Sequence, residues 1–341
     1  MKGNEITAFT CDSQMKRFYL GDNMGHIKCF NLSTGDFIKE FISHENEIVN
    51  VIHSTKYELL ITCSSDLCIK FQDDKELLTT SLIKETYARP GNYYQLNYRV
   101  KLKIAVLDES NSILMIGLTN GTILHYDVAH FKFFLNPNED QDSKTRGQYP
   151  ISSLCNIDDI DFLFVACDNG DKFFTAKAKN RLYHYLADEK FGNFIDNNIN
   201  DINNLENTNQ KNIDKNIVLT SSFISKTYTL ITGCLSGFLC CYDLKPLYEF
   251  MIINETKTEE EIKLNFKKGL DIYMKYKVLI HNEAIKYLFI PEELEPKIII
   301  TTSNDKTVKL VDLKTGKYIE TLKQISIKYN PIPFERINLT I

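Results

Sequence analysis

The sequence contains no tryptophan, although 18 Tyr and 21 Phe supply ample aromatic material for a core. Glycine and proline are also scarce, at 14 and 8 of 341 residues, so most turns must be built from Asn, Asp and Ser. With 43% hydrophobic and 25% charged residues, the composition excludes collagen-like, mucin-like and fibrous proteins. A chain of this length can bury a sizeable core without disulfides or metals. We therefore expect an ordinary globular protein.

Long apolar runs and basic clusters are missing as well. No run approaches the roughly 18 residues of a membrane-spanning helix. The first twelve residues include Glu5 and Asp12 in place of the apolar stretch of a signal peptide. The net charge is −5, and no run of Lys and Arg is dense enough for a phosphate-binding patch. We predict no membrane association and do not expect nucleic acid as a direct ligand.

The nine cysteines are odd in number and irregularly spaced, and several lie inside apolar segments. In a chain without a secretory signal, this pattern indicates reduced thiols that pack as small hydrophobic side chains. We expect a cytoplasmic protein. Association with the cytoskeleton or a cilium, and a nuclear location, stay open.

One pattern recurs six times: an apolar run, a polar turn with Asp, Asn or Gly, and a second apolar run. The six predicted hairpins span 17–32, 58–71, 112–128, 162–175, 229–244 and 298–313. A short strand-like run precedes each hairpin, and a fourth is expected after it. The shortest spacing of equivalent turns, from Gly25 to Leu67, is 42 residues. These units predict an all-β fold, a β-propeller of four-stranded antiparallel blades, with six recognisable units and a seventh left open.

On these residues the chain resembles the WD-repeat β-propeller family. The sixth unit carries the likeness best, through Ile280-His281, Ser303 to Asp305 and Val311 to Leu313. The Trp-Asp dipeptide of that family is never intact, and we place its substitutes at Phe30-Asn31, Phe71-Gln72, Tyr126-Asp127, Phe174-Thr175, Tyr242-Asp243 and Val311-Asp312.

In the resembled family, the Trp indole closes a hydrogen-bonded tetrad with a His, a strand Ser or Thr and a turn Asp. The resemblance therefore implies a divergent propeller in which the tetrad cannot close. Four residues receive structural roles in this interpretation: His44 and His281 as blade-to-blade hydrogen bonders, and Asp66 and Asp305 as turn residues that bond to backbone.

The order of the units is also similar to the C-terminal half of long WD-repeat proteins found with cilia and flagella. The segments Leu20 to Phe30 and His44 to Ile48 carry this second likeness. It implies a place in a large ciliary assembly.

We predict that residues 1–341 form a single propeller with four insertions, at 84–101, 136–149, 192–216 and 255–271. The third has the Asn- and Asp-rich composition of a disordered segment. The fourth is predicted to form a short helix, because Thr258 to Glu261 is a capping box. The first interleaves Tyr with Lys and Arg, a composition that could bind a peptide or simply pack the loop onto neighbouring blades.

Signatures of catalysis are absent from the sequence. It has no glycine loop that cradles phosphate, and the spacing from Gly233 to Gly237 is wrong for a nucleophile elbow. No His or Cys set has the spacing of a zinc site. Acidic pairs such as Asp73-Asp74 are expected to be solvated turn residues. We therefore predict no enzymatic activity, no cofactor and no metal.

These features favour a non-catalytic protein-protein interaction scaffold whose loops hold a protein or peptide partner within a multi-protein complex. The first candidates for partner contact come from the first insertion: Tyr87, Arg89, Tyr93, Tyr94, Tyr98 and Arg99. The second candidates are Glu47 and Glu283, where chain segments enter a blade. Two alternatives stay open: a structural component of a ciliary axoneme or ribonucleoprotein, and a propeller enzyme with a site at the channel mouth.

Overall fold

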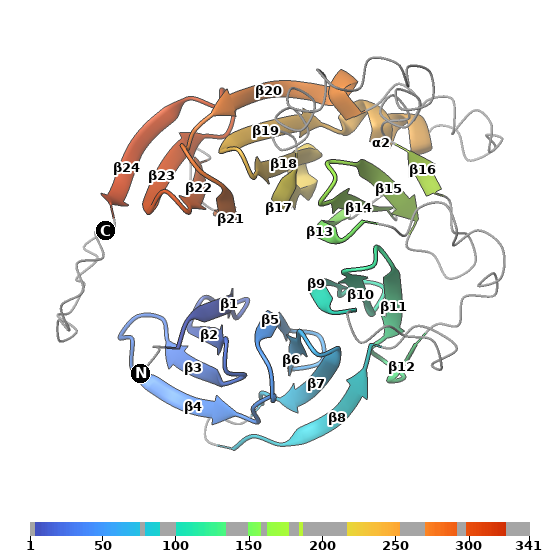
Figure 1. Ribbon diagram of the computed structural model, residues 1–341, viewed down its shortest axis with the longest axis vertical. Coiled ribbons are helices and arrows are strands. Elements are labelled where there is room, and N and C mark those ends of the chain that lie inside the picture. Colours follow the sequence, from blue (N-terminus) through green and yellow to red (C-terminus); the bar gives the residue numbers. More distant parts are fainter. Residues whose placement is uncertain are drawn as a thin grey trace, which may run out of the picture.

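The computed structural model describes residues 4–75, 79–88, 100–133, 149–157, 162–176, 184–186, 217–252, 270–291 and 298–324. Within these residues the strands form six four-stranded antiparallel sheets, which are arranged in a ring as the blades of a β-propeller (Figure 1). The predicted all-β propeller of four-stranded blades is confirmed. No helix among the described residues is long and apolar enough to cross a membrane.

Each blade takes four strands that are consecutive in the sequence. Blade 1 consists of β1 (Ile6–Cys11), β2 (Arg17–Asp22), β3 (Ile27–Asn31) and β4 (Phe37–Phe41). Blade 2 consists of β5 (Ile48–Ser54), β6 (Leu59–Ser64), β7 (Cys68–Asp73) and β8 (Leu82–Tyr87). Blade 3 consists of β9 (Leu102–Asp108), β10 (Ile113–Leu118), β11 (Ile123–Asp127) and β12 (Lys132–Phe133).

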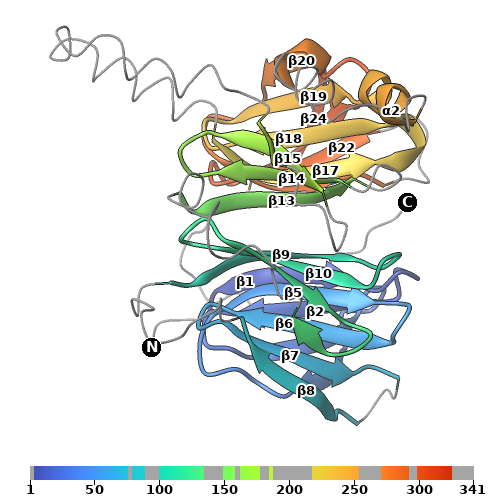
Figure 2. The same ribbon diagram turned by 90° about the vertical axis from the view of Figure 1, so that its right-hand side faces the viewer.

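The second half of the ring repeats this order. Blade 4 consists of β13 (Ile151–Ile157), β14 (Phe162–Cys167), β15 (Lys172–Ala176) and β16 (His184–Leu186). Blade 5 consists of β17 (Val218–Ile224), β18 (Thr229–Cys234), β19 (Phe238–Asp243) and β20 (Met274–Leu279). Blade 6 consists of β21 (Ile285–Phe289), β22 (Ile298–Ser303), β23 (Thr307–Asp312) and β24 (Tyr318–Gln324). The first strand of each blade lies nearest the centre of the ring (Figure 1). Figure 2 shows the ring from the side.

Helix is a minor component of the described residues. It comprises α2 (Lys245–Ile252) and the 3-10 turns η2 (Ser225–Thr227) and η3 (Leu270–Tyr273), all in blade 5. The helix predicted at 255–271 lies almost wholly outside the described residues, as do the insertion at 192–216 and, apart from Tyr149, the insertion at 136–149.

The first predicted insertion was placed too early in the sequence. Residues 84–87 belong to β8, which pairs antiparallel with β7 as the outermost strand of blade 2. This strand is exposed along nearly its whole length, so its sequence lacks the apolar alternation of a half-buried strand. That missing signal explains the error.

Adjacent blades pack through a repeated contact near the ring centre. The first Ile of one blade lies against a small residue in the second strand of the blade before it, as Ile48 does on Gly21, Ile151 on Gly117 and Ile285 on Gly233. A side chain on any of these three glycines would overlap the incoming Ile. At these three junctions a small residue on one blade therefore makes room for a β-branched residue on the next, which lets the two blades pack closely.

The strand registers correct two of the six positions assigned to the missing Trp. Counted from the blade hairpins, Val311 opposes Ile299, and the matching residue of blade 2 is Gln72, which opposes Leu60. In blade 4 the same count leads to Thr175. The assignments at Phe71 and Phe174 were each one residue early, because they followed the nearest aromatic residue. Both of those aromatic rings lie in apolar clusters shared with the following blade.

Candidate functional site

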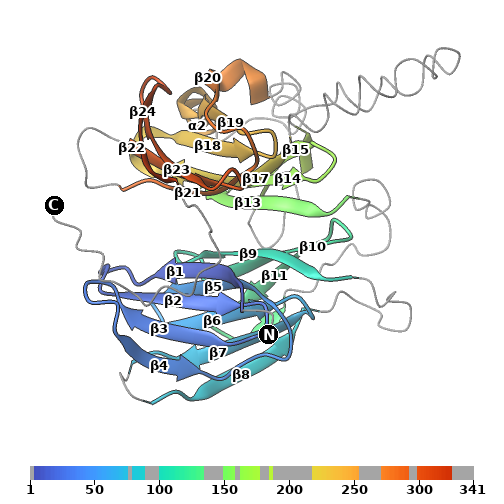
Figure 3. The same cartoon turned by 60° about the vertical axis from the view of Figure 1, so that its left-hand side comes forward.

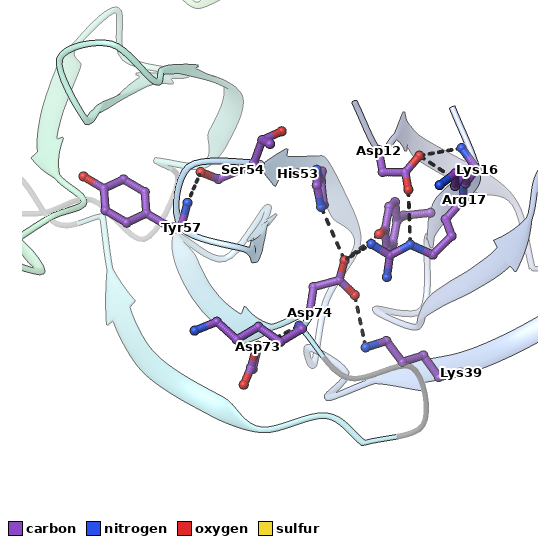
Figure 4. Close-up of polar contacts among 12 residues, drawn as sticks. Asp12, Lys16, Arg17, Lys39, His53, Ser54, Tyr57, Asp73 and Asp74 are labelled. Carbon is purple, nitrogen blue, oxygen red and sulfur yellow. Dashed lines mark hydrogen bonds and ion pairs between the residues drawn. The ribbon is translucent and has the colours of Figure 1, made fainter. Parts of the chain in front are cut away.

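A cluster of charged side chains is buried where blade 1 meets blade 2 (Figure 4). Its centre is Asp74, which directly follows β7 of blade 2 and has a side chain that is only 1% exposed. Blade 1 contributes Arg17 and Tyr19 from β2 and Lys39 from β4, and blade 2 adds His53 from β5. The cluster therefore draws on three strands and on the residue after a fourth, in two blades.

All four neighbours contact the Asp74 carboxylate. Tyr19 donates its hydroxyl hydrogen to Oδ2 at 2.6 Å, and the Arg17 guanidinium lies 3.1 Å from the same oxygen. The Lys39 ammonium is 3.1 Å from Oδ1, and His53 Nε2 is 3.4 Å from Oδ2. Arg17 is held in place by a second carboxylate, that of Asp12, at 3.2 Å.

These contacts control the ionisation of the Asp74 carboxyl. Burial by itself would raise its pKa, but hydrogen bonds from His53, Tyr19 and Lys39 and the charge of Arg17 outweigh burial and lower it. The pKa of the Tyr19 hydroxyl is raised, first by burial and then by its bond to the Asp74 carboxylate. The cluster thus holds a charged Asp74 between a protonated Tyr and two cations.

The role of this cluster is to hold two blades together. A carboxylate that is 1% exposed cannot reach a substrate, and each of its oxygens is already engaged by a partner. What the arrangement does is tie β2 and β4 of blade 1 to β5 and β7 of blade 2. Arg17 and Lys39 are its balancing cations, and removing Asp74 would leave both without that partner.

The predicted structural residues of blade 6 lie together. His281 Nδ1 is 3.0 Å from Oδ2 of Asp305, and His281 Nε2 is 2.8 Å from the Thr301 hydroxyl. Thr301 in turn donates to the Lys309 carbonyl at 3.2 Å, and Thr307 contacts both His281 and Asp305. His281 is buried, which lowers its pKa, while Asp305 partly offsets that effect. The His, Thr and Asp of the expected tetrad are therefore connected without any indole.

Blade 2 holds an equivalent cluster with a different fourth member. His44 Nε2 is 2.8 Å from the Thr62 hydroxyl. The Gln72 amide, at the position corrected above, donates to the same hydroxyl at 3.4 Å and to the Ile42 carbonyl at 3.1 Å. The Gln72 amide N–H thus takes the place of the indole N–H in blade 2, but the tetrad does not close there, because His44 Nδ1 has no hydrogen-bond partner among the described residues and is not bonded to Asp66.

His44, Asp66 and Cys68 place potential metal ligand atoms within 4.8 Å of one another. Burial raises the pKa of the Cys68 thiol to about 12, so the thiolate that a metal needs is disfavoured. Burial also lowers the pKa of His44 to about 4. In blade 6 the corresponding residues, His281, Asp305 and Thr307, simply hydrogen-bond to one another. The blade 2 group is better explained as the same structural cluster.

Of the eight residues predicted to contact a partner, three lie in the described residues: Tyr87, Glu47 and Glu283. Both glutamates are exposed and directly precede or nearly precede the first strand of a blade, β5 and β21 respectively. Tyr87 is 41% exposed at the end of β8, opposite Cys68 at the start of β7. Arg89, Tyr93, Tyr94, Tyr98 and Arg99 lie outside the described residues.

The antiparallel order of the strands brings these three residues to one side of the ring. We call this side the hairpin face: it carries the turns between second and third strands and the segments that enter each first strand. Its described acidic residues are exposed or partly exposed: Glu5, Asp22, Glu45, Glu47, Asp66, Asp168, Asp171, Glu283 and Asp305. The same described segments, with the strand residues that flank the turns, contain three basic residues, Lys101, Lys172 and Lys306.

The other side of the ring has a different charge pattern. Among its described loops, exposed lysines are spread over four blades: Lys16, Lys56, Lys75, Lys226, Lys245, Lys314 and Lys317. Acidic residues are interspersed with them, for example Asp36, Glu58 and Glu249. Acidic residues are thus present on both sides, and the described part of the hairpin face is net negative because it holds few basic residues.

Sequence reasoning missed the Asp74 cluster and the charge of the hairpin face. Asp73-Asp74 was expected to be a solvated pair, yet Asp74 is 3% exposed and Lys39 is 4% exposed. The residues of the cluster are distant in sequence, so no local motif marks them. The hairpin face could have been found, because the acidic residues stand at matching points of the repeat.

Many solved structures share the fold of this chain, but the sequence identities are low. No protein-family model matches it. It is 23% identical over 372 residues to "Cilia- and flagella-associated protein 337 B" of Tetrahymena thermophila, a match that covers 96% of this chain and 28% of that protein. The chain thus spans little more than a quarter of the length of this relative.

Two solved structures illustrate the shared fold. Raptor of Chaetomium thermophilum superposes with a TM-score of 0.63 at 11% identity, covering 94% of this chain and 25% of that one. The computationally designed Ika8 protein superposes with a TM-score of 0.55 at 13% identity, covering 93% of this chain and 74% of that one. Identities this low carry the fold alone, and the propeller part of the family resemblance is confirmed by the six blades.

Proposed function

We propose that this chain is a non-catalytic scaffold of a multi-protein ciliary assembly and that it holds a basic segment of a protein partner on its hairpin face. The observation that carries the binding part is the excess of acidic over basic side chains in the described segments of that face, which also carries Tyr87. A field of one sign on a rigid surface attracts the opposite charge and selects against like-charged partners.

The likeness to a cilia- and flagella-associated protein supports the ciliary part of the proposal, because the match runs through nearly the whole propeller. The ring itself supports a presenting role. Its first strands are joined across blade junctions by side-chain hydrogen bonds, such as Thr7 Oγ1 to the Ile48 carbonyl at 2.6 Å and the Ala105 amide to Asn50 Oδ1 at 2.9 Å. Loops on such a scaffold keep fixed positions relative to one another.

A non-catalytic role agrees with the state of the titratable clusters described above. Asp74 is enclosed, and the imidazoles of His44 and His281 are bonded to threonines of their own blades. A general acid or base needs an accessible proton-transfer atom beside a substrate. An enzyme site at the channel mouth would have to use other residues.

Co-sedimentation tests the proposal. The purified chain is mixed with isolated ciliary axonemes at low and at high salt, and the pelleted fraction is measured. We expect the chain to pellet at low salt and to be released at high salt, because exposed charges are screened beyond about 8 Å at 0.15 M salt. Failure to pellet at low salt, or retention that is indifferent to salt, would contradict it. Tight binding to single-stranded RNA under the same conditions would favour the ribonucleoprotein alternative.

A further inference from the structure

Blades 2 to 6 each bury one residue of the second strand completely against the blade before them. Counted from the hairpins, these residues are Leu60, Leu114, Leu163, Leu230 and Ile299, each in an apolar cluster shared with the preceding blade. All five are 0% exposed. The matching residue of blade 1 is Phe18, which is only partly buried. The corresponding face of blade 1 is therefore not covered in the way that the other blades cover theirs.

That face of blade 1 carries a row of phenylalanines, one from each strand. Phe9, Phe18, Phe30 and Phe37 follow one another with ring centroids 6.1, 5.2 and 5.8 Å apart. Phe9 is 54% and Phe37 is 56% exposed. Tyr19 lies on the opposite face and packs in the cluster shared with blade 2, so the row faces away from blade 2.

Blade 6 has the complementary open face. The second-strand residue that packs on the following blade is 0% exposed in blades 1 to 5, where it is Tyr19, Ile61, Met115, Phe164 and Ile231. Its match in blade 6, Ile300, is only partly buried. On the same face of the sheet, Tyr287 is 53% and Phe289 is 49% exposed.

The two open faces flank the place where the last blade meets the first, which we call the seam (Figures 1 and 3). Across it, the Tyr287 hydroxyl donates to the Thr7 carbonyl at 3.2 Å. Ile6, the first residue of β1, is 63% exposed. At the other five junctions the first residue of the incoming blade is at most 2% exposed: Ile48, Leu102, Ile151, Val218 and Ile285. Blades 6 and 1 thus do not pack on each other as the other neighbours do.

A lysine on the open face of blade 1 indicates what kind of segment lies against such a face. In blades 2 and 6 the second residue of the third strand or its equivalent, Lys70 and Lys309, donates to the backbone carbonyls of Ser43 at 2.8 Å and Ile280 at 2.7 Å. Both carbonyls directly follow the outer strand of the preceding blade or lie within two residues of it. The matching residue of blade 1 is Lys28, which is exposed. Its ammonium is placed to bind the main chain at the end of a neighbouring outer strand.

The seam needs an occupant that is apolar on two sides. At the other five junctions the cover of each face is a β-sheet, and the second strands β6, β10, β14 and β18, which lie between two neighbours, are buried at every residue. A sheet presents side chains to both faces because successive residues point in opposite directions. An amphipathic helix has a single apolar stripe and would cover only one of the two faces.

From these observations we propose that the seam binds a β-sheet of a partner protein. One face of this sheet packs on the row of phenylalanines of blade 1, and the other packs on Tyr287 and Phe289 of blade 6. The end of its outer strand accepts a hydrogen bond from Lys28. The site is separate from the hairpin face, so this inference does not rest on the proposed function, and either can fail without the other.

Photo-crosslinking from both sides of the seam tests the proposal. Three full-length variants each carry one benzoylphenylalanine, at Phe9, at Tyr287 or, as the control, at Ile83 of β8, which is 47% exposed. Each variant is irradiated in a high-salt extract of cells that make the chain, because attraction to the hairpin face is screened there and apolar contacts are not. We expect the Phe9 and Tyr287 positions to form adducts with the same partner protein, in several-fold higher yield than Ile83. The crosslinked partner peptides should be short, nearly continuous apolar runs, as in strands buried on both faces.

Adducts to a peptide of this chain, whether its own segment or a second copy, would overturn the proposal. Adducts to different proteins at the two positions, or yields no higher than that of the Ile83 control, would overturn it as well. A second measurement uses substitutions at exposed sites, with folding checked by circular dichroism. Phe9→Glu combined with Phe289→Glu should abolish the adduct formed from Tyr287, whereas Leu82→Glu, at a site on β8 that is 39% exposed, should leave it unchanged. An adduct that survives the double substitution would contradict a partner sheet in the seam.

Discussion

The junction between blades 1 and 2 and the junction between blades 4 and 5 connect neighbouring blades by different chemistry. The first encloses Asp74 with two cations, a Tyr and a His. The second is an apolar cluster that includes Phe164 and Phe174 of blade 4 with Leu230 and Tyr242 of blade 5. Removing one partner from a buried ion pair leaves an unpaired buried charge, which is strongly destabilising. An apolar cluster is instead held by many individually weak contacts. We therefore expect acid to weaken the first junction through Asp74 and to leave the apolar contacts of the second unchanged.

The largest effect is expected from Asp74→Asn. This change keeps the shape of the side chain but leaves Arg17 and Lys39 without their shared anion, which should lower the free energy of unfolding by about 3–5 kcal/mol. Urea unfolding at neutral pH, followed by circular dichroism, measures it. A loss below that of an exposed ion pair would mean that the cluster does not hold the junction.

Leu230→Ala makes the corresponding change in the apolar junction. Leu230 is fully buried, and its truncation should lower the free energy of unfolding by about 3 kcal/mol through lost contacts and a residual cavity. The two variants should differ in how their losses depend on pH, which separates the two kinds of junction.

The direction of that pH dependence follows from the pKa of Asp74. Its value in the folded protein is lowered from 3.8, so its contribution is complete above 3.8 and is lost as the pH falls through the lowered value. The difference in unfolding free energy between wild type and Asp74→Asn should therefore shrink in acid, while the difference for Leu230→Ala should stay constant. If the loss of unfolding free energy depended on pH in the same way for both variants, the two junctions would not differ in the way proposed.

A smaller effect is expected from Gln72→Leu, which breaks a polar link near the charged junction. The Gln72 side chain accepts from the Ile42 amide at 2.7 Å and donates to the Ile42 carbonyl and to Thr62. Losing these bonds should cost about 1–3 kcal/mol, because buried polar groups are left unpaired. The exposed Gln14→Leu serves as the control in the same urea titration, and a similar loss in both variants would deny Gln72 its bridging role.

The smallest effect is expected from Glu58→Gln. Glu58 and Lys75 form an ion pair at 3.5 Å, with side chains 62% and 59% exposed. Such pairs contribute at most about 1 kcal/mol. A loss as large as that of Asp74→Asn would show that burial is not what gives the Asp74 cluster its importance.

The sequence predicted the architecture well because the blade repeat is local. Alternating apolar runs and turns such as Asp22 to Gly25 mark hairpins that the strand pairing confirms. The outer strand β8 was not predicted, because it is exposed on both faces and its sequence does not alternate between apolar and polar residues. Aromatic residues misled the placement of Gln72, because turn position and not residue type sets the register.

The candidate site was less predictable for a physical reason. Asp12 and Arg17 meet locally within blade 1, but Arg17, Lys39 and the Asp74–His53 pair come together only because two blades stack, and no spacing along the chain encodes that contact. His281 and Asp305 were easier to pair, since they stand at fixed points of one repeat unit. The partner-binding role assigned to Tyr87, Glu47 and Glu283 stays a prediction.

Charge reversal on the hairpin face tests the central claim most directly. The triple variant Glu45→Lys, Glu47→Lys, Glu283→Lys inverts exposed charges there, and Asp36→Lys, Glu58→Lys, Glu249→Lys makes the same change on the other side of the ring. In axoneme co-sedimentation at low salt, we expect the first variant to lose most of its binding and the second to keep it. Equal retention of both variants, with both folded by circular dichroism, would contradict the account.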